Sequence, residues 1–304
     1  MSASKGILYA FITAILWGVL AIALKVSLSE MTPVDISWFR FFLAFLVLAT
    51  YYTIKKPSYL RILKKPPLLL VIATLCLATN YYGFIKGVHL TSPSVAQVFI
   101  QLGPVLLAIS GFVIFHEKVR WRQVLGLILV LVGLVVFYRD QLHVIVSGKN
   151  SWQTGVIWVL IAALTWAIYS VLLKVLVTRH PPMQLNLVIF GLPVLLYLPF
   201  VEFGHFFSIG ITDWLILLFL GLNTLFAYGL LTLAIQYVEA NKISVILVLN
   251  PLLTFGIMAI LGNAGVSWIT HEQYTVVTIV GALIVLAGAI LTILQKNRTA
   301  KSIN

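Results

Sequence analysis

Charged residues are scarce in this chain of 304 residues. Asp, Glu, Lys and Arg make up 9% of it, whereas soluble domains carry about 25%. Hydrophobic residues make up 61%, and a chain this apolar cannot cover its surface with polar groups. The composition therefore excludes an ordinary soluble fold and predicts that the protein lies in a lipid bilayer. The single cysteine, Cys76, excludes an intrachain disulfide.

Acidic residues are the scarcest charged class, with 8 against 20 Lys and Arg. They lie at or near the ends of apolar runs: Glu30, Asp35, Glu117, Asp140, Glu202, Asp213, Glu239 and Glu272. The sequence therefore offers no deep carboxylate for a simple proton relay or for attracting a lipophilic cation. The net charge of +12 does not indicate nucleic acid binding, because the basic residues lie mostly between apolar runs.

Ten apolar runs fill most of the chain, and prolines and polar turns separate them. Their approximate ranges are 6–28, 34–54, 67–87, 92–115, 121–138, 155–177, 183–203, 213–235, 242–268 and 273–294. A helix of 23 residues is about 34 Å long, which is enough to cross a bilayer with some tilt. The sequence predicts an all-α integral membrane protein with ten transmembrane helices.

The first run returns later in the chain as an internal repeat. Residues 6–28 and 155–177 match at seven of 23 positions without a gap, and each copy has one central Trp and a Lys near its far end. We therefore expect a five-helix repeat in residues 1–138, a connecting loop in 139–154, a second repeat in 155–295 and a basic tail in 296–304.

Positive charges predict the orientation of the two repeats. With the N-terminus inside, fourteen Lys and Arg fall in inner segments and three in outer segments, which favours cytoplasmic N- and C-termini. Since five is an odd number, the second repeat enters from the opposite side, and the repeats are inverted. Inverted repeats are a common architecture of secondary transporters.

These features resemble the EamA-type branch of the drug/metabolite transporter superfamily over nearly the whole chain. The motifs that carry the resemblance come in the same order in both halves: LWG at 16–18 and TWA at 165–167, WFRFFLA at 38–44, Gly103-Pro104 and Asn250-Pro251, then Glu117 and Glu272 before glycine-spaced helices. The resemblance implies a solute carrier, often an exporter of amino acids or related metabolites. We expect a bacterial inner-membrane protein that works as a monomer.

The chain departs from a perfect repeat in two places. Ile189 stands where the second copy would carry the counterpart of Arg40, so this charge has no symmetric partner. The second copy also has eight extra residues between its Pro and its Glu, around Gly262–Trp268. That insertion is either an extended helix or loop, or a lid over the outer mouth.

Helix breaks at matching points of two halves are the best sequence pointer to a transport site. Pro104 and Pro251 form such a pair, and each frees a carbonyl one turn back. Polar and aromatic residues at similar depth complete the candidate solute-binding set: Trp17, Arg40, Asn80, Tyr81, Gln97, Gln101, Trp166, Asn223, Tyr228 and Asn250. Packing between helices remains the alternative for several of them, including the two Trp.

Arg40 is the deepest charge, roughly 6 Å from the centre of its run by helical rise. It either holds a solute carboxylate, or snorkels outward, or ties backbone carbonyls together. Lys25 and Lys174 lie nearer the run ends, and we expect them to snorkel. We interpret Glu117 and Glu272 as carboxylates at helix N-termini, where the helix dipole favours them.

The sequence favours a secondary transporter that moves small organic solutes, such as amino acids or related metabolites, outward by alternating access. The alternatives are a membrane-embedded enzyme and a channel or receptor without carrier activity. The pairs His116-Glu117 and His271-Glu272 lack the second His of an HExxH motif. We therefore predict no catalytic residues, no metal and no cofactor, and the expected partners are a solute and the bilayer.

The predicted orientation can be tested by labelling, once Cys76 is replaced so that only a new thiol reacts. A cysteine at Gly148 should react with an impermeant reagent from outside the cell, because it lies in the outer connecting loop. A cysteine at Tyr59 should react only after the membrane is permeabilised. The reverse pattern would refute the inverted arrangement.

Overall fold

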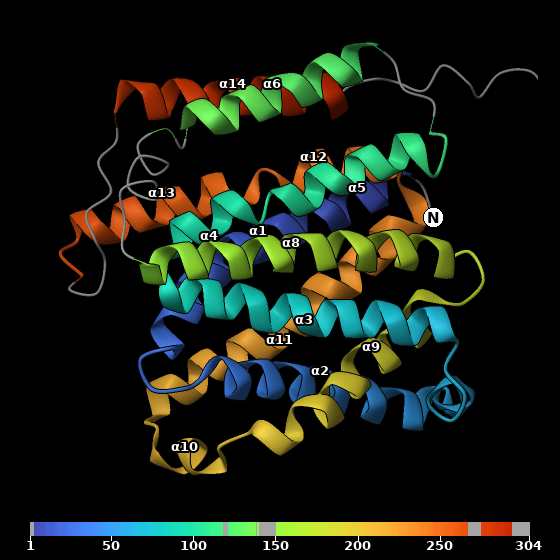
Figure 1. Ribbon diagram of the computed structural model, residues 1–304. Coiled ribbons are helices and arrows are strands. Elements are labelled where there is room, and N and C mark those ends of the chain that lie inside the picture. Colours follow the sequence, from blue (N-terminus) through green and yellow to red (C-terminus); the bar gives the residue numbers. More distant parts are fainter. Residues whose placement is uncertain (1–2, 118–120, 138, 140–149, 267–274, 294–304) are drawn as a thin grey trace, which may run out of the picture.

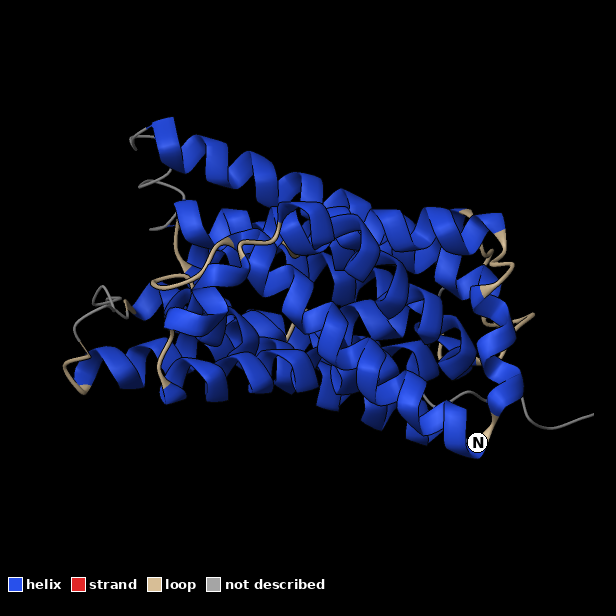
Figure 2. Ribbon diagram, turned by 90° about the horizontal axis from the view of Figure 1, so that it is seen from below, coloured by secondary structure: helices blue, strands red, loops and turns tan. Residues whose placement is uncertain are grey.

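The structure is a computed structural model, which describes the chain except residues 1–2, 118–120, 138, 140–149, 267–274 and 294–304. In the described part every regular element is a helix, which confirms the all-α prediction (Figures 1 and 2). The helices are α1 (Ala3–Ser27), α2 (Pro33–Lys55), η1 (Pro57–Leu63), α3 (Leu68–Leu90), α4 (Pro93–Phe99), α5 (Leu102–Val113), α6 (Trp121–Phe137), α8 (Asn150–Leu176), α9 (Pro182–Tyr197), η2 (Leu198–Phe200), α10 (Phe203–Ser208), α11 (Ile211–Tyr237), α12 (Ala240–Leu247), α13 (Asn250–Asn263) and α14 (Val276–Ile293).

Eight segments in the described residues are long and apolar enough to cross a membrane. They are Ser4–Ser27, Pro33–Lys55, Leu68–Leu90, Pro93–Val113, Trp152–Leu176, Pro182–Phe200, Ile211–Tyr237 and Ala240–Asn263. The predicted fifth and tenth spans correspond to α6 and α14, whose apolar segments are shorter, at Val124–Phe137 and Ile279–Gly288. The structure therefore supports eight of the ten predicted spans by length and composition.

Both helices that contain the Gly-Pro and Asn-Pro pairs are interrupted. The predicted run 92–115 divides into α4 and α5, and the run 242–268 divides into α12 and α13. Just before each proline the backbone tightens, since the N–H of Gly103 bonds to the carbonyl of Ile100 and that of Leu249 to that of Ile246. A proline cannot donate to the carbonyl four residues before it, so each break falls one turn ahead of its proline.

The main helix pairs each join one helix from the first half of the chain to one from the second half. The long helix α3 lies along α8, and α1 lies along α11 (Figure 1). In the sequence repeat α1 corresponds to α8 and α3 to α11, so these two contacts are counterparts. The helix α2 packs against α9, and α6 packs against α14. Within each of these two pairs, the helices are counterparts in the repeat. The core thus lies between the halves rather than within each half.

Glycines bring α6 and α14 into backbone contact at one edge of the molecule (Figure 1). A Cβ on Gly133 would lie 2.7 Å from the backbone nitrogen of Val285 and 3.0 Å from the carbonyl oxygen of Gly281. A Cβ on Gly288 would lie 2.6 Å from the carbonyl oxygen of Gly126. Small residues let helices approach closely, which is a main source of attraction between helices in lipid.

The start of α2 is fixed by a capping box and tied to α10. Thr32 accepts a hydrogen bond from the backbone N–H of Asp35, and the Asp35 carboxylate accepts one from the N–H of Thr32. The same buried carboxylate accepts the backbone N–H of Glu202 at 2.9 Å and lies 2.8 Å from Nδ1 of His205. One acidic side chain therefore holds two chain segments together.

The two lysines at the far ends of α1 and α8 do not snorkel freely, which corrects the expectation for them. Lys25 donates to the carbonyl of Thr91 at 3.4 Å, and Lys174 donates to the carbonyl of Val238 at 3.3 Å. The two acceptors precede α4 and α12, which are counterparts in the repeat. Each lysine therefore ties the end of a long helix to the start of a broken one.

Glu117 forms a cluster with Lys174 and the N-terminus of α12. Its carboxylate lies 2.9 Å from Nζ of Lys174 and accepts the backbone N–H of Ala240 at 2.8 Å and that of Asn241 at 3.3 Å. A Cβ on Gly111 would lie 2.7 Å from this carboxylate, so a glycine makes room for it. Glu117 thus lies at a helix N-terminus, as the sequence suggested, and the N–H groups it accepts are those of α12 in the other half of the chain.

Several predicted features lie outside the described residues. They are Glu272 and His271, most of the connecting loop 139–154, the basic tail 296–304 and the end of the Gly262–Trp268 insertion. Gly262 and Asn263 end α13, so the first residues of the insertion extend a helix.

The close contact of α6 and α14 makes a stability prediction. Gly133→Ala should destabilise the protein by about 1–3 kcal/mol, because the new methyl group meets backbone atoms that cannot rotate away. Gly256→Ala is the matched control, since its Cβ would meet nothing within 4 Å. Thermal unfolding in detergent should show a lower Tm for Gly133→Ala alone; equal Tm values would contradict this packing.

The Asp35 contact makes a pH prediction. The hydrogen bond to Asp35 raises the pKa of His205 above the ordinary value of 6.5. The charged pair therefore stabilises the fold fully below about pH 6.5, and this contribution is lost as the pH rises through the raised pKa. The Tm difference between the parent and His205→Asn should shrink as the pH rises. A difference that stays constant with pH, or that persists when Asp35 is also replaced by Asn, would contradict the pairing.

Candidate functional site

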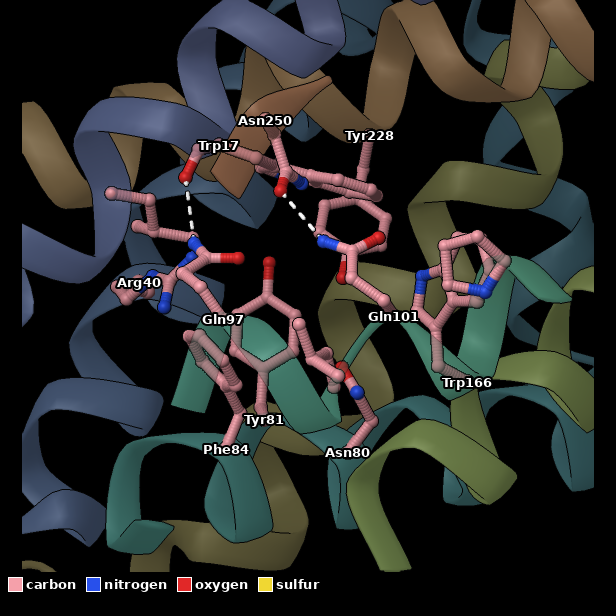
Figure 3. A pocket seen from close by; sticks show the side chains of 13 residues that line it. Trp17, Arg40, Asn80, Tyr81, Phe84, Gln97, Gln101, Trp166, Tyr228 and Asn250 are labelled. Carbon is pink, nitrogen blue, oxygen red and sulfur yellow. Dashed lines mark hydrogen bonds between the residues drawn. The ribbon is translucent and has the colours of Figure 1, made fainter. Parts of the chain in front are cut away.

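A cavity lies where the two broken helices face α1, α2, α3, α8 and α11 (Figure 3). It offers about 60 Å³ to the centres of water-sized molecules. One water needs roughly 10–15 Å³ by this measure, so the space suits a group of about four to six non-hydrogen atoms. Its lining comprises Trp17, Leu20, Arg40, Asn80, Tyr81, Phe84, Gln97, Ile100, Gln101, Pro104, Trp166, Tyr228 and Asn250.

Nine of the ten candidate solute-binding residues line this one cavity, as does Pro104. The exceptions are Asn223, which donates to the carbonyl of Leu16 at 2.8 Å, and Pro251, which lies one residue beyond the lining residue Asn250. Asn223 therefore fastens α11 to α1, which is the packing alternative for this residue. The lining residues come from both halves of the chain, so neither half forms the cavity alone.

The two repeated tryptophans meet at the cavity. The ring centres of Trp17 and Trp166 are 6.0 Å apart in an edge-on arrangement. Tyr228 lies 5.2 Å from Trp17 and 5.5 Å from Tyr81 by the same measure. These rings pack against one another and line the cavity at the same time, so both interpretations of the tryptophans hold.

Amide side chains line the cavity in orientations fixed by other helices. The Gln97 amide donates to the carbonyl of Trp17 at 3.3 Å, and the Gln101 amide donates to Oδ1 of Asn250 at 3.0 Å (Figure 3). The latter bond joins one broken helix to the other. Asn80 donates to the carbonyl of Ala162 at 2.8 Å. A polar side chain in lipid needs such partners, so these bonds set the shape of the site.

Arg40 is buried at the cavity wall and does not snorkel. Its side chain is 2% exposed, Nε donates to Oγ1 of Thr224 at 3.0 Å, and its guanidinium carbon lies 4.4 Å from the ring centre of Tyr81. The four ion pairs among the described residues do not include Arg40. A hydroxyl and a ring face thus position the guanidinium without neutralising it.

The cavity has no acidic residue among its described lining, and Arg40 is its one cation. The described residues also contain no group of three or more His, Cys, Asp or Glu that could hold a metal ion. What the arrangement offers is a positive charge, several amides and aromatic faces, which can bind a small polar molecule.

Sequence reasoning missed three lining residues: Leu20, Phe84 and Ile100. All are apolar residues in apolar helices, and only their position in the fold separates them from their neighbours. Thr224, which positions Arg40, was among the polar residues of its helix but carried no signal of this partnership.

The sequence profile of the EamA-like transporter family matches residues 4–139 and again residues 153–294. The uncharacterized inner membrane transporter YhbE of Escherichia coli K12 is 34% identical over 290 residues, which cover 94% of this chain and 90% of the relative. The probable amino-acid metabolite efflux pump of Salmonella typhimurium LT2 is 23% identical and covers 99% of each chain.

A protein of known crystal structure shares the fold. It is 20% identical, and its structure covers 98% of this chain and 100% of its own with a TM-score of 0.75. The helical arrangement described above is therefore one that an experimental structure also shows.

Proposed function

Because the chain belongs to the EamA-like transporter family, and is thus a multi-pass membrane transporter and not an enzyme, we propose that it is a secondary transporter of small organic solutes. The proposed solutes are amino acids or related metabolites, and the proposed mechanism is export by alternating access. The cavity at the two helix breaks is the proposed solute site.

One observation carries this proposal: the cavity lies between the halves, at both breaks, and both halves line it. If the halves move relative to each other, such a site changes its exposure without being taken apart. The bond between Gln101 and Asn250 would then report on this movement, since it joins the two broken helices.

We also propose that the chain crosses the membrane ten times in two inverted repeats, with α6 and α14 as the fifth and tenth spans. The exchange of counterparts in the helix pairs supports it. Two side-chain amides also support the inverted repeats, because Asn80 on α3 donates to a carbonyl of α8 and Asn223 on α11 donates to a carbonyl of α1. The charge distribution supports cytoplasmic termini in a bacterial inner membrane. We also propose that the monomer is the working unit, since both halves of the site come from one chain.

The cluster of Glu117 and Lys174 would then close the cytoplasmic side of the site. It fastens the ends of α5 and α8 to the N-terminus of α12. The counterpart on the outer side begins with Lys25 and the carbonyl of Thr91. Alternating access requires that these two ends open in turn, so the inner contacts must break when the site faces the cytoplasm.

The solute class has two supports. The free space suits a small polar molecule, and the Salmonella relative is named as a probable efflux pump for an amino-acid metabolite. A counterflow assay tests the function: purified protein in liposomes preloaded with one amino acid, nucleoside or sugar is given the labelled form outside. We expect saturable uptake with counterflow for at least one amino acid. Saturable flux without counterflow would count against a carrier.

The broken helices make a kinetic prediction. Pro104→Ala and Pro251→Ala restore a backbone donor at each break, so the helices should straighten and exchange should slow at least several-fold. Solute affinity should change less, because neither side chain donates or accepts a hydrogen bond. Counterflow rates and binding curves for both variants measure the two effects. Parental rates in both would remove the main support for the site.

A further inference from the structure

The Gln97 side chain presents an unpaired acceptor to the cavity. The residue is 2% exposed, and its amide nitrogen donates to the carbonyl of Trp17. That carbonyl can only accept, so the side chain must turn its nitrogen toward α1 and its oxygen the other way. The oxygen Oε1 is buried and has no hydrogen-bond partner. A buried acceptor without a partner costs free energy until a donor reaches it.

Gln101 repeats this arrangement one helical turn later. It is also 2% exposed, its nitrogen donates to Asn250, and its Oε1 is buried without a partner. Figure 3 shows the Gln97 oxygen and the Tyr81 hydroxyl pointing into the space between Arg40 and Gln101. The Gln97 oxygen therefore faces the cavity as an acceptor, and Gln101, between α4 and α5, brings a second buried acceptor to the lining.

Donors collect around the same space. Arg40 brings a positive charge, and it is Nε of its guanidinium that donates to Thr224. The two terminal nitrogens retain the planar donor geometry that suits a carboxylate. The Nε1 of Trp17 is buried and also has no partner. The described lining contains no carboxylate that could compete for Arg40.

We propose that the site recognises a zwitterion, with the solute carboxylate at Arg40 and its ammonium group at the side-chain oxygens of Gln97 and Gln101. This rests on the proposed function, since it names the solute chemistry of the same cavity. The bound solute supplies a negative charge to the one cation and N–H donors to the two orphaned oxygens. A solute with only one of these groups leaves the other set unpaired.

The charge balance separates this solute class from its neighbours. A simple amine would place a second positive charge beside Arg40 without a counter-charge. A simple carboxylic acid would satisfy Arg40 and leave both amide oxygens buried and unpaired. Sites that bury polar groups discriminate strongly against analogues that cannot pair with them.

The test uses alanine, whose six non-hydrogen atoms match the free space, and three analogues that each lack one feature: alaninamide, propanoate and ethylamine, with leucine and its amide as a larger set. Binding to the purified parent protein is measured by thermal shift and by inhibition of amino-acid counterflow. We expect each analogue to bind about tenfold to hundredfold more weakly than its amino acid, as for a lost charged hydrogen bond. Equal binding of an amide and its parent amino acid would overturn the assignment to Arg40.

Two variants locate the carboxylate. Arg40→Lys keeps the charge but loses the planar donor pair, so the preference for the amino acid over its amide should fall about tenfold or more. Thr224→Val removes only the hydroxyl that positions Nε, and the same preference should fall less. Arg61→Lys, on the exposed surface of η1, is the matched control and should keep the parental preference. An unchanged preference in both cavity variants would overturn the proposal.

The outcomes separate this inference from the proposed function. Counterflow of sugars or nucleosides alone, with no amino acid bound, would leave the carrier function standing and refute the zwitterion site. Amino-acid binding with the expected analogue order but no flux of any solute would support the site and refute the carrier. Amino-acid counterflow that falls in step with the loss of either charged group supports both.

Discussion

The structure depends on one constraint: lipid offers no hydrogen bonds, so each polar group in a span must find its partner in the protein. The two prolines interrupt their helices and expose backbone and side-chain groups at mid-membrane. The amides of Gln97, Gln101 and Asn80 meet this need by bonding to neighbouring helices. These bonds hold the helices together and leave the remaining acceptors facing the cavity. The contacts that pack these helices are thus also the ones that shape the cavity.

Much of this arrangement was readable from the sequence. Apolar length predicted eight of the spans, and the Gly-Pro and Asn-Pro pairs predicted both helix breaks, because these features act locally along the chain. The partners of Glu117 and Lys174 were not predicted. Their contacts join residues far apart in sequence: Glu117 binds Lys174 and the N–H of Ala240, both in the other half of the chain. Asn223 was grouped with the cavity residues but lies outside their lining, because helix periodicity does not say which neighbour each face of a helix meets.

The scaffold is nearly symmetric, but its chemistry is not. Trp17 and Trp166 occupy equivalent positions and touch each other, as expected at an axis between two repeats. Arg40 has no such counterpart, since Ile189 is the equivalent residue and is fully buried among apolar side chains. In the proposed mechanism, the similarity of the two halves allows the movement, and the single unmatched charge makes the site asymmetric. A solute with one carboxylate fits this division.

The central claim is that the two ends of the cavity open in turn, and paired distances test it most directly. Spin labels at Val113 and Thr178 report on the inner end, and labels at Ile260 and Ser29 occupy the equivalent outer positions; all four side chains are exposed. With Cys76 replaced, both distances are measured by double electron–electron resonance in liposomes, with and without a transported amino acid. The account predicts that one distance lengthens as the other shortens. Two distances that stay fixed, or that lengthen together, would contradict it.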